Sequence, residues 1–198
     1  TLADTAKAKQ ELGVVGKKVV LSFGGSLGAA MVNKAMQHLV LHNKNREDIV
    51  HFHVVGRYDE GKFVKFLDEN NINNPDRIIV NEYLYDIAKY MAAADIIICR
   101  CGALTIAELS CMGKASILIP SPNVAENHQY YNAMTLVKKL AAKLVEEKDL
   151  TRDSIVAAVS ELIDNPKNLE EMSKASKMSA ILDTNERIYQ VIMELLTR

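Results

Sequence analysis

Short apolar runs alternate with amphipathic stretches along most of this 198-residue chain. Such runs are typical of strands that are buried on both faces, and we expect strands at residues 19–23, 49–55, 77–80, 96–99, 115–119 and 142–145. Apolar residues recur at helical spacing between them, which predicts helices at residues 29–41, 59–67, 86–94, 103–112 and 123–140, the last starting a few residues in. This alternation predicts an α/β fold, a parallel sheet of about six strands with helices on both faces.

Capping signals predict three more helices after the last strand. Thr151 suits the N-cap of a helix that ends near Ile163, and Asn165 followed by Pro166 suits the start of the next. Asp183 and Glu186 have capping-box spacing for a last helix at residues 187–196. Residues 1–12 read as a polar helix or tail. With no repeat or internal linker, we expect one domain over residues 1–198, with 1–16 as a leading segment and 183–198 as a terminal helix.

Composition narrows the class of protein. Hydrophobic residues make up 48% and charged residues 25%, as in soluble globular proteins, and the net charge of −1 gives no electrostatic case for nucleic acid. We find no secretory signal and no apolar run near the roughly 18 residues that span a bilayer. Cys99, Cys101 and Cys111 have poor spacing for a metal and are expected to be core residues in a reducing cytosol.

One stretch carries the clearest chemical signal, at residues 95–108. An apolar strand at 96–99 breaks at Gly102 and continues as a helix. The first turn of a helix offers unpaired N–H groups and a partial positive charge, so this stretch predicts an anion site. Thr105 and Glu108 lie three apart and share a helix face. The hydroxyl suits a phosphate oxygen and the carboxylate suits the vicinal hydroxyls of a ribose, so the stretch can hold a sugar nucleotide.

Two other loops are expected at the same edge of the sheet, where ligands of such sheets bind. The loop Gly24-Gly25-Ser26-Leu27-Gly28 is a phosphate-loop candidate, although a tight turn without a ligand also explains it. Its glycine spacing disfavours NAD, and Ala29-Ala30 in place of Gly-Lys-Ser/Thr disfavours ATP. The second segment, residues 126–132, presents His128, Gln129 and Asn132, whose polar groups suit sugar hydroxyls; a solvated helix face is the alternative.

The remaining candidates are weaker. Tyr83-Leu84-Tyr85 could cover a flat base or could simply pack, and His38, His42, His51 and His53 are expected to be structural. The chain has no Asp-x-Asp pair. A transferase of this kind would therefore stabilise a leaving diphosphate with helix N-termini, without a divalent metal or other cofactor.

Three motifs together resemble the MurG family of bacterial UDP-N-acetylglucosamine (UDP-GlcNAc) transferases. They are Gly-Gly-Ser-Leu-Gly-Ala at 24–29, Arg-Cys-Gly-Ala-Leu-Thr-Ile-Ala-Glu at 100–108, and Ile-Leu-Ile-Pro at 117–120 followed by His-Gln-Tyr-Tyr-Asn-Ala at 128–133. Order and spacing agree from Lys17 to about Met178. The family has two Rossmann-like domains around a cleft (a GT-B glycosyltransferase), and this chain resembles only the carboxyl-terminal, donor-binding one.

The resemblance implies a role for each matching position. Ser26 and Thr105 would contact the diphosphate together with the loop that contains Gly25 and Gly28, and the backbone of Ala103 and Leu104, after Gly102, would face sugar or phosphate. Glu108 would hold the ribose and the Leu84 backbone would read the uracil edge. Gln129 and Asn132 would bind the N-acetylglucosamine, with His128 beside them. Leu27 stands where the family commonly has glutamine, so the resemblance carries no side-chain role over to this position.

The resemblance also implies what this chain lacks. The amino-terminal domain would supply the lipid-linked acceptor site, the membrane-facing patch and the general base, so no catalytic residue is expected here and the 198 residues are expected to bind UDP-GlcNAc without turning it over. The full enzyme would be a cytoplasmic, peripheral membrane glycosyltransferase of peptidoglycan synthesis, inverting and metal-independent. The terminal helix would pack towards the absent domain or on a second copy. Alternatives are a donor subunit of a dolichol-linked or glycolipid transferase using another UDP-sugar, and a non-catalytic nucleotide-sugar sensor.

Overall fold

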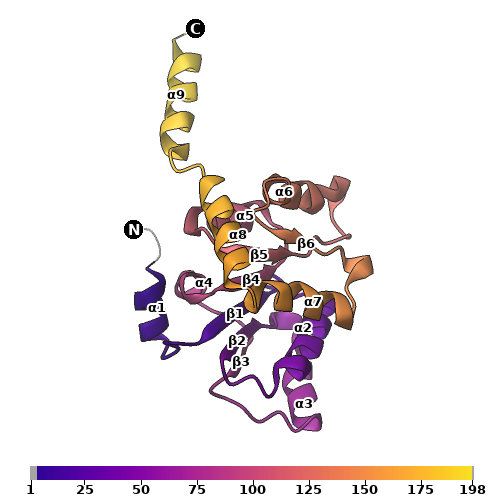
Figure 1. The fold of residues 1–198 in the computed structure, drawn as a ribbon. Helices are drawn as coiled ribbons and strands as arrows, with labels where there is room; N and C mark the ends of the chain where they lie inside the picture. Colours follow the sequence, from indigo (N-terminus) through magenta and orange to yellow (C-terminus); the bar gives the residue numbers. More distant parts are fainter. Residues whose placement is uncertain (1–3, 198) are drawn as a thin grey trace.

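A computed structural model describes residues 4–197. Within this range the strands form one six-stranded sheet in the order β3-β2-β1-β4-β5-β6, and every pair is parallel (Figure 1). The strands are β1 Lys18–Phe23, β2 Ile49–Val54, β3 Ile78–Asn81, β4 Ile96–Cys99, β5 Ala115–Leu118 and β6 Lys143–Leu144. All six predicted strands are thus confirmed. The order reverses between β1 and β4, which pair directly, and this switch point is where open α/β sheets bind ligands.

Apart from the last one, α9, the helices lie in two layers, one on each face of the sheet. They are α1 Thr5–Glu11, α2 Ala30–Asn43, α3 Lys62–Glu69, α4 Ile87–Ala93, α5 Ala103–Met112, α6 His128–Val137, α7 Arg152–Ile163, α8 Pro166–Met178 and α9 Thr184–Leu196, with single 3₁₀ turns η1 Arg57–Asp59, η2 Ala125–Asn127 and η3 Glu147–Asp149. Alternate strand residues supply the two cores: Val20 and Ile98 pack with α2, α3 and α7, whereas Leu21 and Cys99 pack with α4, α5 and α6. Both faces are buried because successive side chains point to opposite sides.

Several predicted boundaries are confirmed by their caps. Thr151 and Ser154 cap the start of α7 reciprocally, and Asn165 Oδ1 accepts the Asn168 N–H at 3.3 Å, with Pro166 as the first residue of α8. The leading segment contains a helix, α1, whose N-cap Asp4 accepts the Lys7 N–H at 3.0 Å. Residues 1–3 of that predicted segment lie outside the described range.

Three local predictions were wrong. The second helix begins at Lys62 instead of 59, because Glu60 and Gly61 have left-handed backbones and the Asp59 carboxylate instead accepts the Phe63 N–H at 2.9 Å. The predicted helix over 123–140 is α6, which starts a few residues in, as expected, after left-handed residues at 126 and 127. It ends at Val137 instead of 140, where Leu140 is left-handed. The capping box at Asp183 does not form, because its carboxylate pairs with Arg187 at 2.9 Å.

The last helix stands apart from the body of the molecule. Figure 1 shows α9, in yellow, projecting beyond the end of α8, and none of its described residues is buried. Apolar side chains such as Ile188, Val191 and Leu195 are each more than half exposed. Among residues 4–197, no helix is long and apolar enough to cross a membrane.

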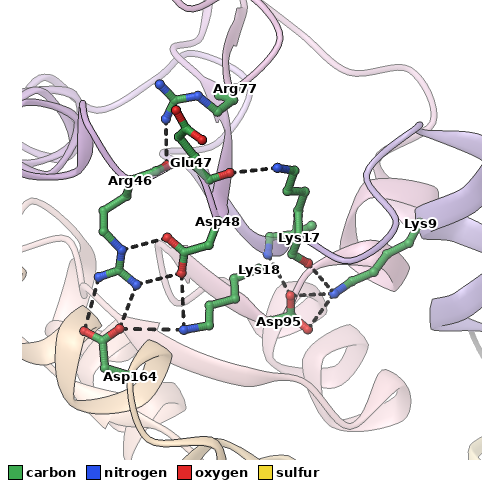
Figure 2. Close-up of polar contacts among 10 residues, drawn as sticks. Lys9, Lys17, Lys18, Arg46, Glu47, Asp48, Arg77, Asp95 and Asp164 are labelled. Atoms are coloured by element: carbon green, nitrogen blue, oxygen red, sulfur yellow. Dashed lines mark hydrogen bonds and ion pairs between the residues drawn. The ribbon is translucent and has the colours of Figure 1, made fainter.

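Ion pairs crowd the amino-terminal edge of the sheet (Figure 2). Lys9 of α1 binds the Asp95 carboxylate at 2.7 Å, and the same carboxylate accepts the Val19 N–H at 2.6 Å. Arg46 bridges Asp48 and Asp164, each at 2.8 Å. These contacts connect α1, the loop before β2 and the residue after α7 to the starts of the strands. This edge therefore stabilises the fold.

Candidate functional site

A cleft of about 540 Å³ opens at the opposite, carboxyl-terminal edge of the sheet. It lies at the switch point, since its walls come from the loops after β1, β4 and β5 and from the first turns of α2 and α5. Gln129 of α6 and Glu147 of η3 complete the lining. The lining residues are Phe23, Gly24, Gly25, Gly28, Ala29, Ala30, Met31, Arg100, Gly102, Thr105, Ser121, Asn123, Gln129 and Glu147. The three loops that the sequence placed on one edge therefore do meet in one cavity.

The glycine loop holds its shape by close backbone contact. Gly28 has φ +85°, and a Cβ there would lie 2.2 Å from the Val55 carbonyl oxygen. A Cβ on Gly56 would lie 2.1 Å from the Gly28 nitrogen. The loop is also tied to the chain after β2 by the Tyr58 N–H, which donates to the Leu27 carbonyl at 3.1 Å. Glycine is therefore required so that the loop after β1 can lie against the loop after β2.

Two helix N-termini face the cleft without side-chain caps. The N-caps are Ala29 for α2 and Gly102 for α5, and neither has a side chain that could accept a hydrogen bond. Within residues 4–197, the first three amides of each helix make no backbone hydrogen bond; the first bonded amides are those of Asn33 and Ile106. Two sets of unpaired N–H groups and two helix dipoles thus converge on one cavity, which is an arrangement that favours a doubly charged anion.

Two amide side chains of α6 join the loops that follow β4 and β5. Gln129 Oε1 accepts the N–H groups of Cys101 at 3.2 Å and Ser121 at 3.0 Å, and Asn132 Nδ2 donates to the Cys101 carbonyl at 3.0 Å. These contacts fix how each amide is turned. Gln129 keeps its Nε2 donors and Asn132 keeps its Oδ1 acceptor without a partner in the described part of the chain, so the pair offers both hydrogen-bonding functions.

Sequence reasoning missed a buried ion pair in the cleft. Arg100 Nη1 donates to the carbonyls of Ile119 at 3.3 Å and Pro120 at 3.0 Å, and Nη2 pairs with the Glu147 carboxylate. The two side chains are only 14% and 17% exposed. Arg100 opens the motif at 100–108, so a signal existed for it. Nothing in the sequence pointed to Glu147, which comes from η3, 47 residues later.

The other predicted site residues do not line the cleft. On α5, Ala103, Leu104 and Glu108 are exposed, and Leu104 is 82% exposed. Leu84 is buried in the core under α4, between exposed tyrosines. Outside the lining, Ser26 lies in the glycine loop, Asn132 bonds the Cys101 carbonyl as above, and His128 is exposed with Nδ1 3.0 Å from the Ala125 carbonyl oxygen.

Buried titratable groups near the site are held neutral. Burial raises the pKa of the Cys101 thiol to about 12, so it is not a nucleophile at neutral pH. Burial also lowers the pKa of His51 to about 4, and the His51 and His53 rings both contact Ser22 Oγ at 2.7 Å inside the sheet layer, consistent with structural roles. In the described residues no group of three His, Cys, Asp or Glu side chains could hold a metal ion.

Fold and cleft together define a doubly wound α/β domain, with a candidate anion site at the switch point of its parallel sheet. The glycosyltransferase family 28 C-terminal domain matches residues 19–188, and the chain belongs to this family. The UDP-N-acetylglucosamine--N-acetylmuramyl-(pentapeptide) pyrophosphoryl-undecaprenol N-acetylglucosamine transferase of Bacillus cytotoxicus is 35% identical over 195 residues, which is 97% of this chain and 52% of that protein. The enzyme of the same name from Desulforudis audaxviator is 38% identical over 192 residues, 92% of this chain and 52% of that protein.

A solved structure agrees with this assignment. The crystal structure of MurG from Acinetobacter baumannii superimposes with a TM-score of 0.78 at 27% identity, over 94% of this chain and 53% of that one. The chain spans about half the length of the curated relatives it matches. The resemblance drawn from the motifs at 24–29, 100–108 and 128–133 is confirmed, as is the fold class.

Proposed function

We propose that this chain is the UDP-GlcNAc-binding half of an inverting glycosyltransferase that adds N-acetylglucosamine to a lipid-linked N-acetylmuramoyl pentapeptide. The observation that carries this proposal is the convergence of two uncapped helix N-termini on one cleft at the switch point. The named activity of the relatives supports the choice of donor. Uracil would lie towards Leu84, the ribose on Glu108, and the diphosphate between Gly25, Ser26 and Thr105.

The chemistry follows from where charge develops. The C4 hydroxyl of the acceptor attacks the anomeric carbon, the bond from that carbon to the diphosphate oxygen breaks, and the configuration inverts from α to β. UDP leaves with an additional negative charge, which the N–H groups of α2 and α5 stabilise in place of a divalent metal. The proton of the hydroxyl passes to a base on the other half of the enzyme. This half therefore positions the donor and stabilises the leaving UDP.

The hexose would lie against the start of α6. Gln129 offers donors and Asn132 an acceptor, with orientations already fixed by the loops after β4 and β5. A hexose hydroxyl can both donate and accept, so such a pair can satisfy neighbouring hydroxyls without reorganisation. His128, which is exposed at the same helix start, would lie beside the sugar.

The exposed face of α9 would pack on the amino-terminal half. Its apolar side chains have no cover in the described residues, and burying them would remove an otherwise unfavourable surface from water. The complete enzyme would bind the cytoplasmic face of the membrane through that other half, which also holds the acceptor. In its absence a second copy of this chain is the competing partner for α9, and sedimentation of the 198 residues distinguishes monomer from dimer.

A calorimetric titration tests the donor assignment. UDP-GlcNAc should bind more tightly than UDP-galactose or UDP-glucose, and the 198 residues alone should not transfer N-acetylglucosamine to the lipid acceptor. Absence of UDP binding would remove the proposal. Equal affinity for the three sugars would retain a nucleotide site but exclude hexose selection by α6, and preference for a different sugar would favour a glycolipid synthase.

A further inference from the structure

The pair formed by Arg100 and Glu147 is unusual among the ion pairs of this molecule. Most of the others lie on the surface with at least one partner more than a third exposed, as in Lys143 with Glu161, where the carboxylate is 55% exposed. Arg100 and Glu147 are both more than four-fifths buried, and both line the cleft that receives the two helix N-termini. A carboxylate in a cavity built for an anion is repulsive, so its presence calls for a reason.

The contacts of Arg100 supply that reason. Its Nη1 holds the carbonyls of Ile119 and Pro120, where β5 leads into the loop that Gln129 also binds through the Ser121 N–H. Its Nη2 is held by Glu147 of η3, which also lines the cleft. The guanidinium is thus held by one charged and two neutral acceptors. These contacts fix its orientation before a ligand binds, and the carboxylate partly balances its charge.

We propose that Arg100 is the side-chain cation of the diphosphate subsite and that Glu147 is the residue that positions it and moderates its charge. This inference deepens the proposed function, on which it rests for the identity of the anion. In the free protein the pair is neutral, which spares the cleft an unpaired buried charge. When a diphosphate binds, the guanidinium adds to the field of α2 and α5, and Glu147 limits the affinity so that the product can leave.

The two partners therefore have opposite expected effects on anion affinity. Arg100→Met removes the cation and leaves a carboxylate, so it should weaken binding of UDP and of inorganic pyrophosphate by about tenfold. Glu147→Gln keeps a hydrogen-bond acceptor for Arg100 but removes the negative charge, so it should strengthen binding of both anions by about threefold. The double variant should bind more tightly than Arg100→Met alone. Uridine, which has no phosphate, should bind all variants equally.

The experiment is an NMR titration of the full chain with pyrophosphate, UDP and uridine, for the parent, the two single variants and the double variant. Glu161→Gln is the matched control, because it removes the carboxylate of an ion pair outside the cleft, and it should change none of these affinities. Circular dichroism melts show whether each variant folds. If Arg100→Met does not fold, Glu147→Gln alone decides, because a purely structural pair predicts weaker binding and this proposal predicts stronger binding.

The outcomes separate this inference from the proposed function. Weaker pyrophosphate binding by Glu147→Gln, or unchanged pyrophosphate affinity in Arg100→Met, overturns the inference. The proposed donor site is retained in that case if the parent binds UDP. If the parent does not bind UDP, but Arg100→Met weakens and Glu147→Gln strengthens pyrophosphate binding, the inference is supported and the uridine-nucleotide assignment is overturned. If the parent binds neither UDP nor pyrophosphate, this inference and the proposed function are both overturned.

Discussion

Strand β4, which has four residues, connects two opposite environments. At its start, Asp95 is held by Lys9 and by the Val19 N–H, in an edge where cations and carboxylates pair directly (Figure 2). Three residues after its end, Gly102 is the N-cap of α5, whose first amides have no partner in the described chain. One edge satisfies its polar groups and stabilises the fold. The other leaves polar groups unsatisfied, which costs stability and provides binding capacity.

The difference shows how a parallel sheet separates stability from function. All strands run the same way, so every helix that follows a strand begins at one edge and every strand begins at the other. Substitutions at the starting edge should lower the free energy of unfolding without changing affinity. Substitutions at the carboxyl-terminal edge should do the reverse, except where the loop itself needs a special backbone, as at Gly28.

The largest effect is expected at that exception, with Gly28→Ala. The new Cβ would lie 2.2 Å from the Val55 carbonyl oxygen in a backbone with φ +85°. We expect a loss of about 3 kcal/mol in the free energy of unfolding and loss of UDP binding, measured by urea denaturation and calorimetry. Gly25→Ala is the control, since φ is +96° there but a Cβ meets nothing within 4 Å; its cost should be about 1 kcal/mol. Equal costs for the two variants would contradict the close contact.

Acid should produce the next largest effect, in the middle of the sheet. The pKa of His51 is lowered from 6.5 to about 4 by burial, so the unfolded state takes up the proton first. Stability is complete above pH 6.5 and is lost as pH falls towards 4, by up to about 3 kcal/mol. Arg46 lowers the pKa of Asp48 and Asp164, so their contribution is lost only further below 3.8.

Urea titrations from pH 7 to 4 measure this dependence. His51→Gln should remove much of the dependence of the free energy of unfolding on pH, because residue 51 then no longer takes up a proton when the chain unfolds. His42→Gln, at an exposed position on α2, should retain it. A parent protein whose stability is constant between pH 6.5 and 4 would show that the ring is protonated or solvated in the fold.

Asp95→Asn tests the stabilising edge. The variant leaves Lys9 without its carboxylate and weakens the contact that holds α1 against the body. We expect a loss of about 2 kcal/mol in the free energy of unfolding and faster hydrogen exchange in α1. Affinity for UDP should stay within error of the parent. A change in affinity comparable to that of a cleft variant would contradict the separation of the two edges.

Glu108→Ala tests the binding edge and should have the smallest effect on stability. The side chain is exposed on α5, so the free energy of unfolding should be unchanged. Loss of hydrogen bonds between a carboxylate and the ribose should weaken UDP about tenfold. Glu171→Ala, on the exposed surface of α8, is the control. Calorimetry that gives equal UDP affinity for parent and Glu108→Ala would remove the ribose assignment.

Local patterns were sufficient to predict most of the fold. The apolar runs around Ile96–Cys99 and Val19–Phe23 predict buried strands because both faces of a covered parallel sheet are apolar. The caps at Thr151 and Asn165 predict helix starts because short polar side chains satisfy the first amides. Asp183 misled because its carboxylate can also pair with Arg187 one turn later, and spacing alone does not decide between the two.

The site was predicted less completely, for a physical reason. Gly28, Gly102 and Thr105 line the cleft, and they could be selected beforehand because glycine breaks and helix starts are visible in the sequence. Glu147 was not, since its importance comes from a contact between residues far apart in the chain. The orientations of Gln129 and Asn132 follow from their contacts with the loops at Cys101 and Ser121, which the sequence does not show. A side chain that is already bonded on one side offers a ligand only its remaining atoms.

The contact between Gly28 and Gly56 has a consequence for how this sequence can change over time. Each position excludes a side chain because of the backbone at or beside the other, and neither obstruction is the movable end of a side chain. A second substitution therefore cannot relieve a first one, and no smaller residue exists as an intermediate. We expect lineages that descend from this sequence to retain both glycines, 28 positions apart, while the residues between them drift. This pair of glycines is then a better search pattern than the glycine loop alone.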